Sequence, residues 1–199
     1  MENEILNTEE AVNAEAEKAV QEDKDDFEKV MATILLIVYN MEHTKVTAKN
    51  IKNAKLEIHN QLGEYLLRSQ RRFEGLLQSV STNTHDRLQK LSQERFEAFD
   101  SYYDRWHVNK NDWYDNLSYS VARLEKQIID ALTANINYTA TEDEPSVDTK
   151  PVQKAVEKGS ATHERTSKAI VQDECHYVLA STLLLAMKAN GYTHFRFKA

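Results

Sequence analysis

The sequence predicts a mainly α-helical protein, in which a long helical arm is followed by a small α-rich α+β module that ends in a short β-strand. Three observations support this prediction. The 199 residues include only 4 glycines and 2 prolines, so turns are scarce and long helices are expected. Apolar residues recur every three or four positions along most of the chain, which is the spacing of one helix face. The last eight residues, "YTHFRFKA", instead alternate as a strand does.

The N-terminal segment is the most acidic part of the chain. The formal net charge is −7, and residues 1–30 hold eleven Asp and Glu against three lysines, a balance of 3 − 11 = −8. The rest of the chain therefore sums to −7 + 8 = +1. Because residues 1–24 are acidic, poor in aromatic residues and weakly apolar, we expect them to form a disordered or loosely helical tail.

Residues 25–106 make up the predicted helical arm. A helix is expected from Asp25 through "FEKVMATILLIVYNM", and Thr47 is the expected N-cap of a second, longer helix. The polar stretch "STNTHD" at 81–86 predicts a break, after which Thr84 caps a third helix that continues to the end of the arm. No internal repeat of fixed length is evident in the sequence.

Residues 107–199 make up the predicted small module. Its first helix is expected over 113–135, and a linker follows at 137–151, where "NYTATEDEPSVDTKP" contains both prolines. A short helix is expected next, with Gly159 as its C-cap. The last helix is expected over 161–189, ended by the dipeptide "NG" before the terminal strand.

Composition limits the classes of protein that the chain can belong to. A single cysteine rules out an intramolecular disulfide framework and is typical of a reducing compartment. The longest apolar runs, at 32–39 and 178–187, are about half of the roughly 20 residues that a membrane-spanning helix needs. The N-terminus is acidic and lacks the basic-then-apolar pattern of a signal peptide. We therefore expect a soluble protein of intracellular origin with no membrane segment.

One stretch, "AIVQDECHYVL" at 169–179, places four potentially reactive side chains together. In a helix the neighbours Cys175 and His176 diverge by about 100°, which does not suit a nucleophile and its base. A zinc site needs ligands at helical spacing, and "HERTS" at 163–167 lacks the second histidine of a zincin helix. We therefore expect no catalytic residue, no metal and no cofactor at this stretch.

A structural role explains the same stretch better. Four side chains follow the spacing i, i+3, i+4, i+7 and so share one helix face. Carboxylates beside large apolar groups need donors, and Arg165 or Arg196 could supply bidentate ones. The sequence therefore predicts an ion-pair clamp that ties the last helix to the strand after it. The face consists of Ile170, Asp173, Glu174 and Tyr177.

Two further stretches have alternative interpretations. The aromatic residues of 99–115 could stack on nucleic-acid bases, but their helical spacing is more typical of a packed stripe. Basic residues of the arm could contact DNA phosphates or a partner, although lysines on a long helix often form only a solvated face. The possible DNA or partner contacts are Lys49, Lys52, Lys55, Arg68, Arg71 and Arg72.

The sequence "ERTSKAIVQDECHYVLASTLLLAMKANGYTHFRFKA" resembles the signature of the phage Mu protein F-like minor head family, also called the minor capsid or head morphogenesis family. "WYDNLSYSVARLEKQIIDALTAN" at 113–135 is similar to the family's Trp- and Asn-bearing helix, so the resemblance covers about 105–199. Gln172 stands where the family usually has arginine. The family also continues past the strand, so we expect a truncated product or a sheet completed by partner chains. The motif positions are Arg165, Ile170, Asp173, Glu174, Gly191, Phe195 and Phe197.

The resemblance implies a structural, non-enzymatic role. The expected protein is a phage minor head protein at the portal vertex, which assists capsid assembly, genome packaging or DNA ejection. Its expected partners are the portal protein or other capsid proteins, and packaged DNA, within an oligomeric assembly inside the virion after assembly in the host cytoplasm. One alternative is the carrier module of a longer protein with a C-terminal toxin or ADP-ribosyltransferase domain. Another is a coiled-coil scaffold or ejection protein.

Overall fold

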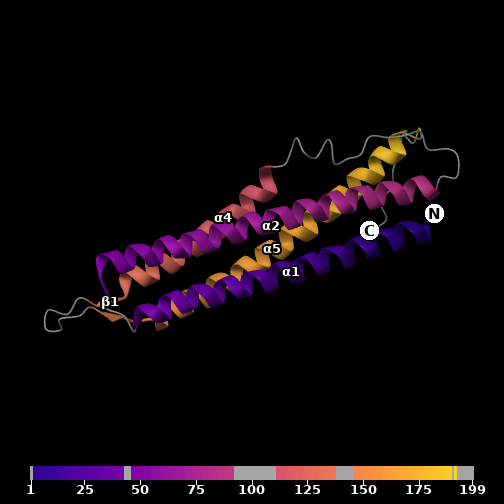
Figure 1. Cartoon of the computed structure of the whole chain (residues 1–199). Coiled ribbons are helices and arrows are strands. Elements are labelled where there is room, and N and C mark those ends of the chain that lie inside the picture. The colour runs from indigo at the N-terminus through magenta and orange to yellow at the C-terminus, as the bar shows by residue number, and fades with distance from the viewer. Residues whose placement is uncertain (1, 43–45, 92–110, 138–145, 190, 192–199) are drawn as a thin grey trace. The chain divides into compact units, whose positions relative to one another are not determined.

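A computed structural model describes residues 2–42, 46–91, 111–137, 146–189 and 191. Its main elements are long helices, so the mainly α prediction is confirmed (Figure 1). The expected terminal strand, with Arg196, Phe195 and Phe197, lies outside the described residues, as does most of the expected third helix. The helices are α1 (Glu2–Glu42), α2 (Ala48–Leu91), α4 (Asn111–Ala134) and α5 (Lys150–Ala189), and the two-residue strands are β1 (Ile136–Asn137) and β2 (Ser146–Val147).

Helix α1 corrects the prediction of a disordered or loosely helical tail over 1–24. It is one continuous helix of 41 residues that includes this acidic segment. Val12, Ala16 and Ala19 are buried, at 7% exposure or less. A helix rich in charged residues is stable when one stripe of small or apolar side chains packs against neighbours. Of the acidic residues of this segment, Glu9, Glu10, Glu17 and Glu22 are exposed on the outer face of a packed helix, whereas Asp23 is buried.

Two predicted helix boundaries are wrong, and one is confirmed. The Thr47 hydroxyl accepts a hydrogen bond from the Asn50 N–H at 3.1 Å, so Thr47 is the N-cap of α2 as expected. The predicted break at 81–86 is absent, because α2 continues to Leu91 with Thr84 fully buried. The predicted short helix and the last helix form one 40-residue helix, α5, with Gly159 in its interior.

The ends of α5 are set by local signals. The Asp148 carboxylate accepts a hydrogen bond from the Lys150 N–H at 3.1 Å and so caps the start of the helix. Just before it, β1 and β2 pair antiparallel, with Ile136 opposite Val147, inside the segment expected to be only a linker. At the other end, Gly191 has a φ of 75° and its N–H bonds to the Lys188 carbonyl at 3.1 Å. This is the glycine termination that "NG" predicted.

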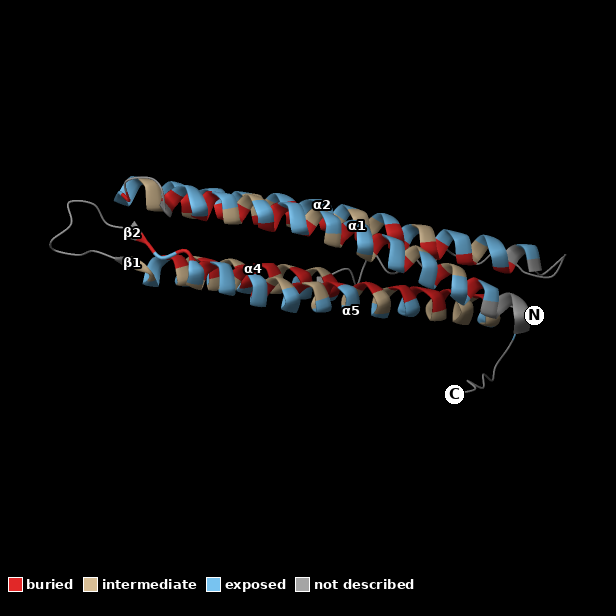
Figure 2. Cartoon of the chain, turned by 90° about the horizontal axis from the view of Figure 1, so that it is seen from below, coloured by how far each residue is buried: buried red, intermediate tan, exposed pale blue. Residues whose placement is uncertain are grey.

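Buried side chains lie on one side of each helix (Figure 2), and their spacing reveals a repeat that inspection of the sequence missed. In α1 and α2 the buried positions recur with spacings of 4, 4 and 3, which is an eleven-residue repeat. Such a repeat corresponds to about 3.67 residues per turn and differs from the seven-residue repeat of left-handed coiled coils. The positions are Thr8, Val12, Ala16, Ala19, Asp23, Phe27, Val30, Ile34, Val38 and Met41 in α1, and Ala54, Ile58, Leu62, Tyr65, Ser69, Phe73, Leu76, Val80 and Thr84 in α2.

The chain forms two compact units, which divide it differently from the expected arm and module. The first unit comprises Met1–Val20, Arg71–Tyr114 and Ala169–Ala199, and the second comprises Gln21–Gln70 and Asp115–Lys168. Each unit therefore combines residues from both the predicted arm and the predicted module. The boundary could not be seen in the sequence, because each long helix contributes to both units without a break.

The second unit is a four-helix bundle in which each helix packs against the next. Its core includes Phe27, Ile58, Leu62, Ile128 and Val156, all at 3% exposure or less. Side-chain contacts join α1 to α2, α2 to α4, α4 to α5, and α5 back to α1, which is the order of an up-and-down bundle. These contacts are Asp26–Arg68, His59–Glu125, Leu124–Gly159 and Lys24–Glu164.

The first unit contains segments of α1, α2 and α5 and the start of α4. The Glu15 carboxylate accepts hydrogen bonds from Ser79 at 3.2 Å and Asn83 at 3.1 Å, which joins α1 to α2. The ring of Trp113, at the start of α4, lies edge-on to Phe73 of α2 with centroids 6.4 Å apart. Trp113 is 2% exposed, so this aromatic residue of the 99–115 stretch is packed. The other aromatics of the predicted stripe, before residue 111, lie outside the described residues.

Candidate functional site

A hydrogen-bonded chain of polar side chains crosses the interior of the second unit. The Tyr65 hydroxyl lies 2.8 Å from the Asp23 carboxylate and 2.8 Å from Nε2 of His163. Nδ1 of His163 lies 3.0 Å from the Ser120 hydroxyl, and the Ser167 hydroxyl donates to Asp23 at 3.0 Å. All four helices contribute, since Asp23 is on α1, Tyr65 on α2, Ser120 on α4 and the other two on α5.

The hydrogen-bonding capacity of these groups fixes the direction of each bond. The Asp23 carboxylate only accepts, so the single Tyr65 proton is donated to it. The Tyr65 oxygen then accepts from Nε2–H of His163, which leaves Nδ1 as the acceptor for Ser120. The chain thus runs from Ser120 through neutral His163 and Tyr65 to Asp23, and each donor meets an acceptor. Such satisfied buried networks favour one arrangement of the helices over others.

The surroundings keep His163 neutral. Its side chain is 1% exposed, and its ring lies 4.6 Å from the Phe27 ring. Burial lowers the pKa of His163 from 6.5 to about 4, and the nearby Asp23 charge opposes this shift only in part. An imidazole with so low a pKa carries only one ring proton at neutral pH, so the uncharged form is the one that fits this interior.

The Ser120–His163 pair resembles a nucleophile and its base in geometry, but its chemistry differs. A catalytic base works best when its pKa lies near the working pH, whereas the pKa of His163 is about 4. The carboxylate of the network also lies beyond Tyr65 and does not orient the imidazole directly. The arrangement therefore suits the joining of four helices by hydrogen bonds and does not suit proton transfer to a substrate.

Sequence reasoning missed every member of this network. "HERTS" was examined only for a second histidine, yet its histidine is the centre of the network. A usable signal existed, because Asp23 and Tyr65 occupy positions of the eleven-residue buried stripe. A charged residue within a buried stripe needs a partner in the interior, and the partners come from helices far away in sequence.

The stretch 173–176 has two different environments in the first unit. Cys175 is 1% exposed, and its pKa is raised to about 12, chiefly by burial and also by the charges of Glu15 and Glu174. A thiol with this pKa is protonated and unreactive at neutral pH. His176 is exposed, with Nε2 3.1 Å from the Asn13 side-chain oxygen. The two neighbours thus point to different sides of α5.

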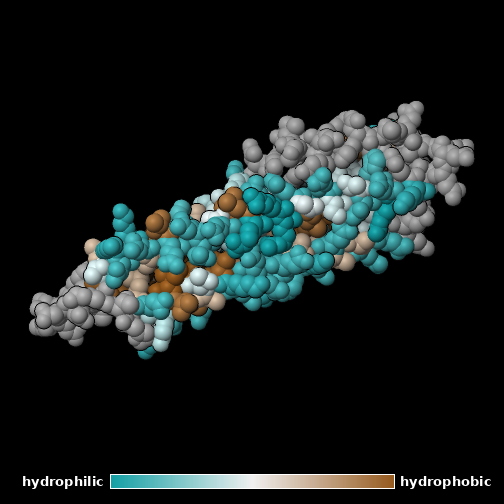
Figure 3. Space-filling view, in the orientation of Figure 1, coloured by the Kyte–Doolittle hydropathy of each residue, from teal (hydrophilic) through white to brown (hydrophobic). Residues whose placement is uncertain are grey.

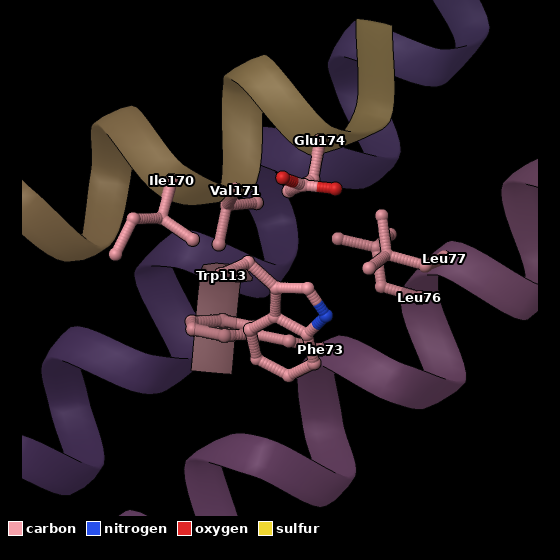
Figure 4. A pocket seen from close by; sticks show the side chains of 7 residues that line it. All are labelled: Phe73, Leu76, Leu77, Trp113, Ile170, Val171 and Glu174. Atoms are coloured by element: carbon pink, nitrogen blue, oxygen red, sulfur yellow. The ribbon is translucent and has the colours of Figure 1, made fainter. Parts of the chain in front are cut away.

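The terminal strand of the predicted ion-pair clamp, with Arg196, lies outside the described residues, so the structure describes only the helix side of the clamp. Ile170 and Glu174 line a small apolar hollow with Phe73, Leu76, Leu77, Trp113 and Val171 (Figure 4), and the hollow is too small to admit a water molecule. Asp173 and Tyr177 are exposed instead. Arg165 is also exposed and lies eight residues before Asp173 on one helix, about 12 Å along its axis. It therefore lies too far along the helix for a close ion pair.

The basic residues expected to contact DNA fall into different settings. Lys49 and Lys52 are exposed on α2 of the second unit. Arg68 makes two hydrogen bonds to the Asp26 carboxylate, at 3.0 and 3.1 Å. These bonds and the negative charge of Asp26 raise the pKa of the guanidinium. Lys55 is half-buried in the same unit. Arg71 and Arg72, one exposed and one half-buried, belong to the first unit.

Within the described ranges, no group of three or more His, Cys, Asp or Glu side chains is arranged to hold a metal ion. None of the described helices is both long and apolar enough to span a membrane. In the space-filling view, hydrophilic residues cover most of the displayed face and a smaller group of hydrophobic residues interrupts them (Figure 3). No protein-family model, curated protein or solved structure matches the chain.

Proposed function

We propose that this chain is a structural, non-catalytic binding protein that acts through its surface in a larger assembly. The observation that carries this proposal is the buried network. Its serine, histidine, tyrosine and aspartate side chains bond to one another across four helices, in a core where His163 has a pKa of about 4. In the first unit, Cys175 is likewise buried as a thiol. Side chains that are buried and bonded to one another in this way stabilise the fold that presents a binding surface.

The proposed assembly is a phage head, where the chain would be a minor head protein inside the virion. Support comes from the resemblance of the last helix to the Mu protein F-like minor head family. On that helix, Asp173 and Tyr177 are exposed one turn apart, and the Tyr177 side chain is 53% exposed. Tyrosine is enriched among residues that contribute most to binding at protein interfaces. The proposed partner at this surface is the portal protein, bound during capsid assembly, genome packaging or DNA ejection.

The test combines particle analysis with a binding measurement. The chain should be present in purified phage particles, and a portal gene should lie immediately upstream of its gene. Tyr177→Ser should weaken binding to purified portal rings at least about tenfold, a loss of about 1.4 kcal/mol. Tyr119→Ser is the matched control, because Tyr119 is 70% exposed on α4, away from the last helix and its motif positions. Absence from particles, or equal effects of both substitutions, would contradict the proposal.

A second candidate, a coiled-coil scaffold or ejection protein, is favoured by one observation. The predicted break at 81–86 is absent, and the eleven-residue stripe of α2 continues through Thr84. A scaffold protein would be abundant in procapsids and missing from mature particles, whereas a minor head protein would remain. The carrier-module alternative is distinguished by reading the gene beyond the codon for Ala199.

A further inference from the structure

The outer face of α5 in the second unit carries a row of five basic side chains, with the exposed Glu157 at its edge. At 100° per residue, five basic positions fall within an arc of about 80°. All five are exposed, while Val152, Val156 and His163 on the opposite side are buried. The row spans 18 residues, or about 27 Å at 1.5 Å per residue. Its members are Lys150, Lys154, Lys158, Arg165 and Lys168.

The charges of this row are not used inside the described structure. Within the described residues, none of the five side chains forms an ion pair. Glu164, the acidic residue next to Arg165, instead faces α1 and lies 3.8 Å from Lys24. Residues 150–168 contain five basic and two acidic side chains, a balance of 5 − 2 = +3, in a chain whose net charge is −7. The row is thus a local concentration of cations in an acidic protein.

We propose that this row binds the phosphate backbone of nucleic acid without sequence preference. Neighbouring cations of the row are three or four residues apart, about 4.5 to 6 Å along the axis, except Lys158 and Arg165, which are seven residues or about 10.5 Å apart. A strand of phosphates can run beside such a row. Phosphate binding of this kind needs charge and little apolar contact. A protein partner would instead require buried apolar or aromatic anchors. The large exposed apolar side chains of the described residues include none from 150–168, their members being Leu36, Tyr39, Leu56, Leu67, Tyr119 and Tyr177.

The proposed site differs from the one expected from sequence, which lay on α2. It also does not depend on the phage setting, because the α5 row binds phosphates in any compartment that holds nucleic acid. Failure of DNA binding would leave the presence of the chain in particles and the effect of Tyr177→Ser unchanged. The two proposals therefore fail separately.

The test measures the salt dependence of binding to a duplex of about 30 base pairs with the full chain, by fluorescence anisotropy. Five phosphate contacts predict a slope of about −4.5 in log K against log salt, or an approximately 500-fold loss of affinity from about 50 to 200 mM. The triple variant Lys154→Gln, Lys158→Gln, Arg165→Gln keeps two contacts, so its slope should fall to about −1.8 and its loss to about 12-fold. Its circular dichroism should match that of the wild type, because all three side chains are exposed.

The matched control is Lys49→Gln, Lys52→Gln, Lys55→Gln, which removes the same charge from α2 of the same unit. This variant should retain the wild-type slope. The proposal is overturned if the wild type does not bind DNA at low salt, if the α5 variant keeps the full slope, or if only the α2 variant loses it. Binding of the chain to vesicles of phosphatidylcholine and phosphatidylserine is measured as well. Binding to these vesicles as strong as to DNA would overturn the proposal and assign the row to a membrane surface.

Discussion

Protonation of His163 should destabilise the protein at acidic pH. Its pKa is about 4 in the folded protein, compared with 6.5 for the free side chain. In the unfolded chain the imidazole therefore takes up a proton at a higher pH than in the folded protein. Between these two pKa values the unfolded state binds more protons, so the free energy of unfolding falls as the pH falls from about 7 to about 4.

The size of this effect follows from the two pKa values. A difference of about 2.5 pKa units corresponds to about 3 kcal/mol once the pH lies below both values. Between about pH 7 and pH 5 the expected loss is about 2 kcal/mol. With a urea m-value of about 2 kcal/mol per molar, the unfolding midpoint should fall by about 1 M.

The assay is urea unfolding, followed by circular dichroism at a series of pH values, for the wild type and two variants. His163→Gln keeps a side-chain N–H for Tyr65 but cannot titrate, so it should lose most of the additional acid sensitivity. His59→Gln is the control, because the His59 side chain is 63% exposed and bonds only at the surface to Glu125. It should lose stability with pH as the wild type does. An identical pH dependence of wild type and His163→Gln would refute the reasoning about the buried network.

Three other predictions concern single positions. Gly159→Ala should lower the free energy of unfolding by about 1–3 kcal/mol, because its Cβ would lie 2.3 Å from Cδ1 of the buried Leu124. Gly63→Ala, with nothing within 4 Å of the added Cβ, should instead raise the free energy of unfolding by about 0.5–1 kcal/mol. Thermal or urea unfolding measures both effects. A thiol reagent at pH 8 should label Cys175 only after urea unfolding, since burial raises the pKa of the thiol to about 12; rapid labelling of the folded chain would contradict that burial. Thr47→Ala should cost about 1 kcal/mol through loss of the cap on α2, and an unchanged unfolding midpoint would show that the cap contributes nothing.

Local sequence signals predicted the local features of the fold well. The scarcity of glycine and proline correctly indicated long helices, Thr47 correctly marked the start of α2, and Gly191 correctly marked the end of α5. These features depend on backbone propensity and on hydrogen bonds within a few residues. The polar stretch at 81–86 and the glycine at position 159 gave wrong predictions, because a local signal does not include contacts with other helices. Each is a helix-ending signal when considered alone, but packing of the stripe through Thr84, and close approach of Leu124 to Gly159, outweigh it.

By itself, the sequence determined that most of the chain becomes long helices, because helix propensity and the spacing of apolar residues are properties of neighbouring residues. Only the tertiary structure decided that the acidic N-terminal segment packs as a helix, and that the chain divides into two units that cut across the predicted arm and module. It also brought Asp23, Tyr65 and His163 to within hydrogen-bonding distance. The physical reason is that these outcomes depend on contacts between residues 42 to 144 positions apart, which no local pattern encodes.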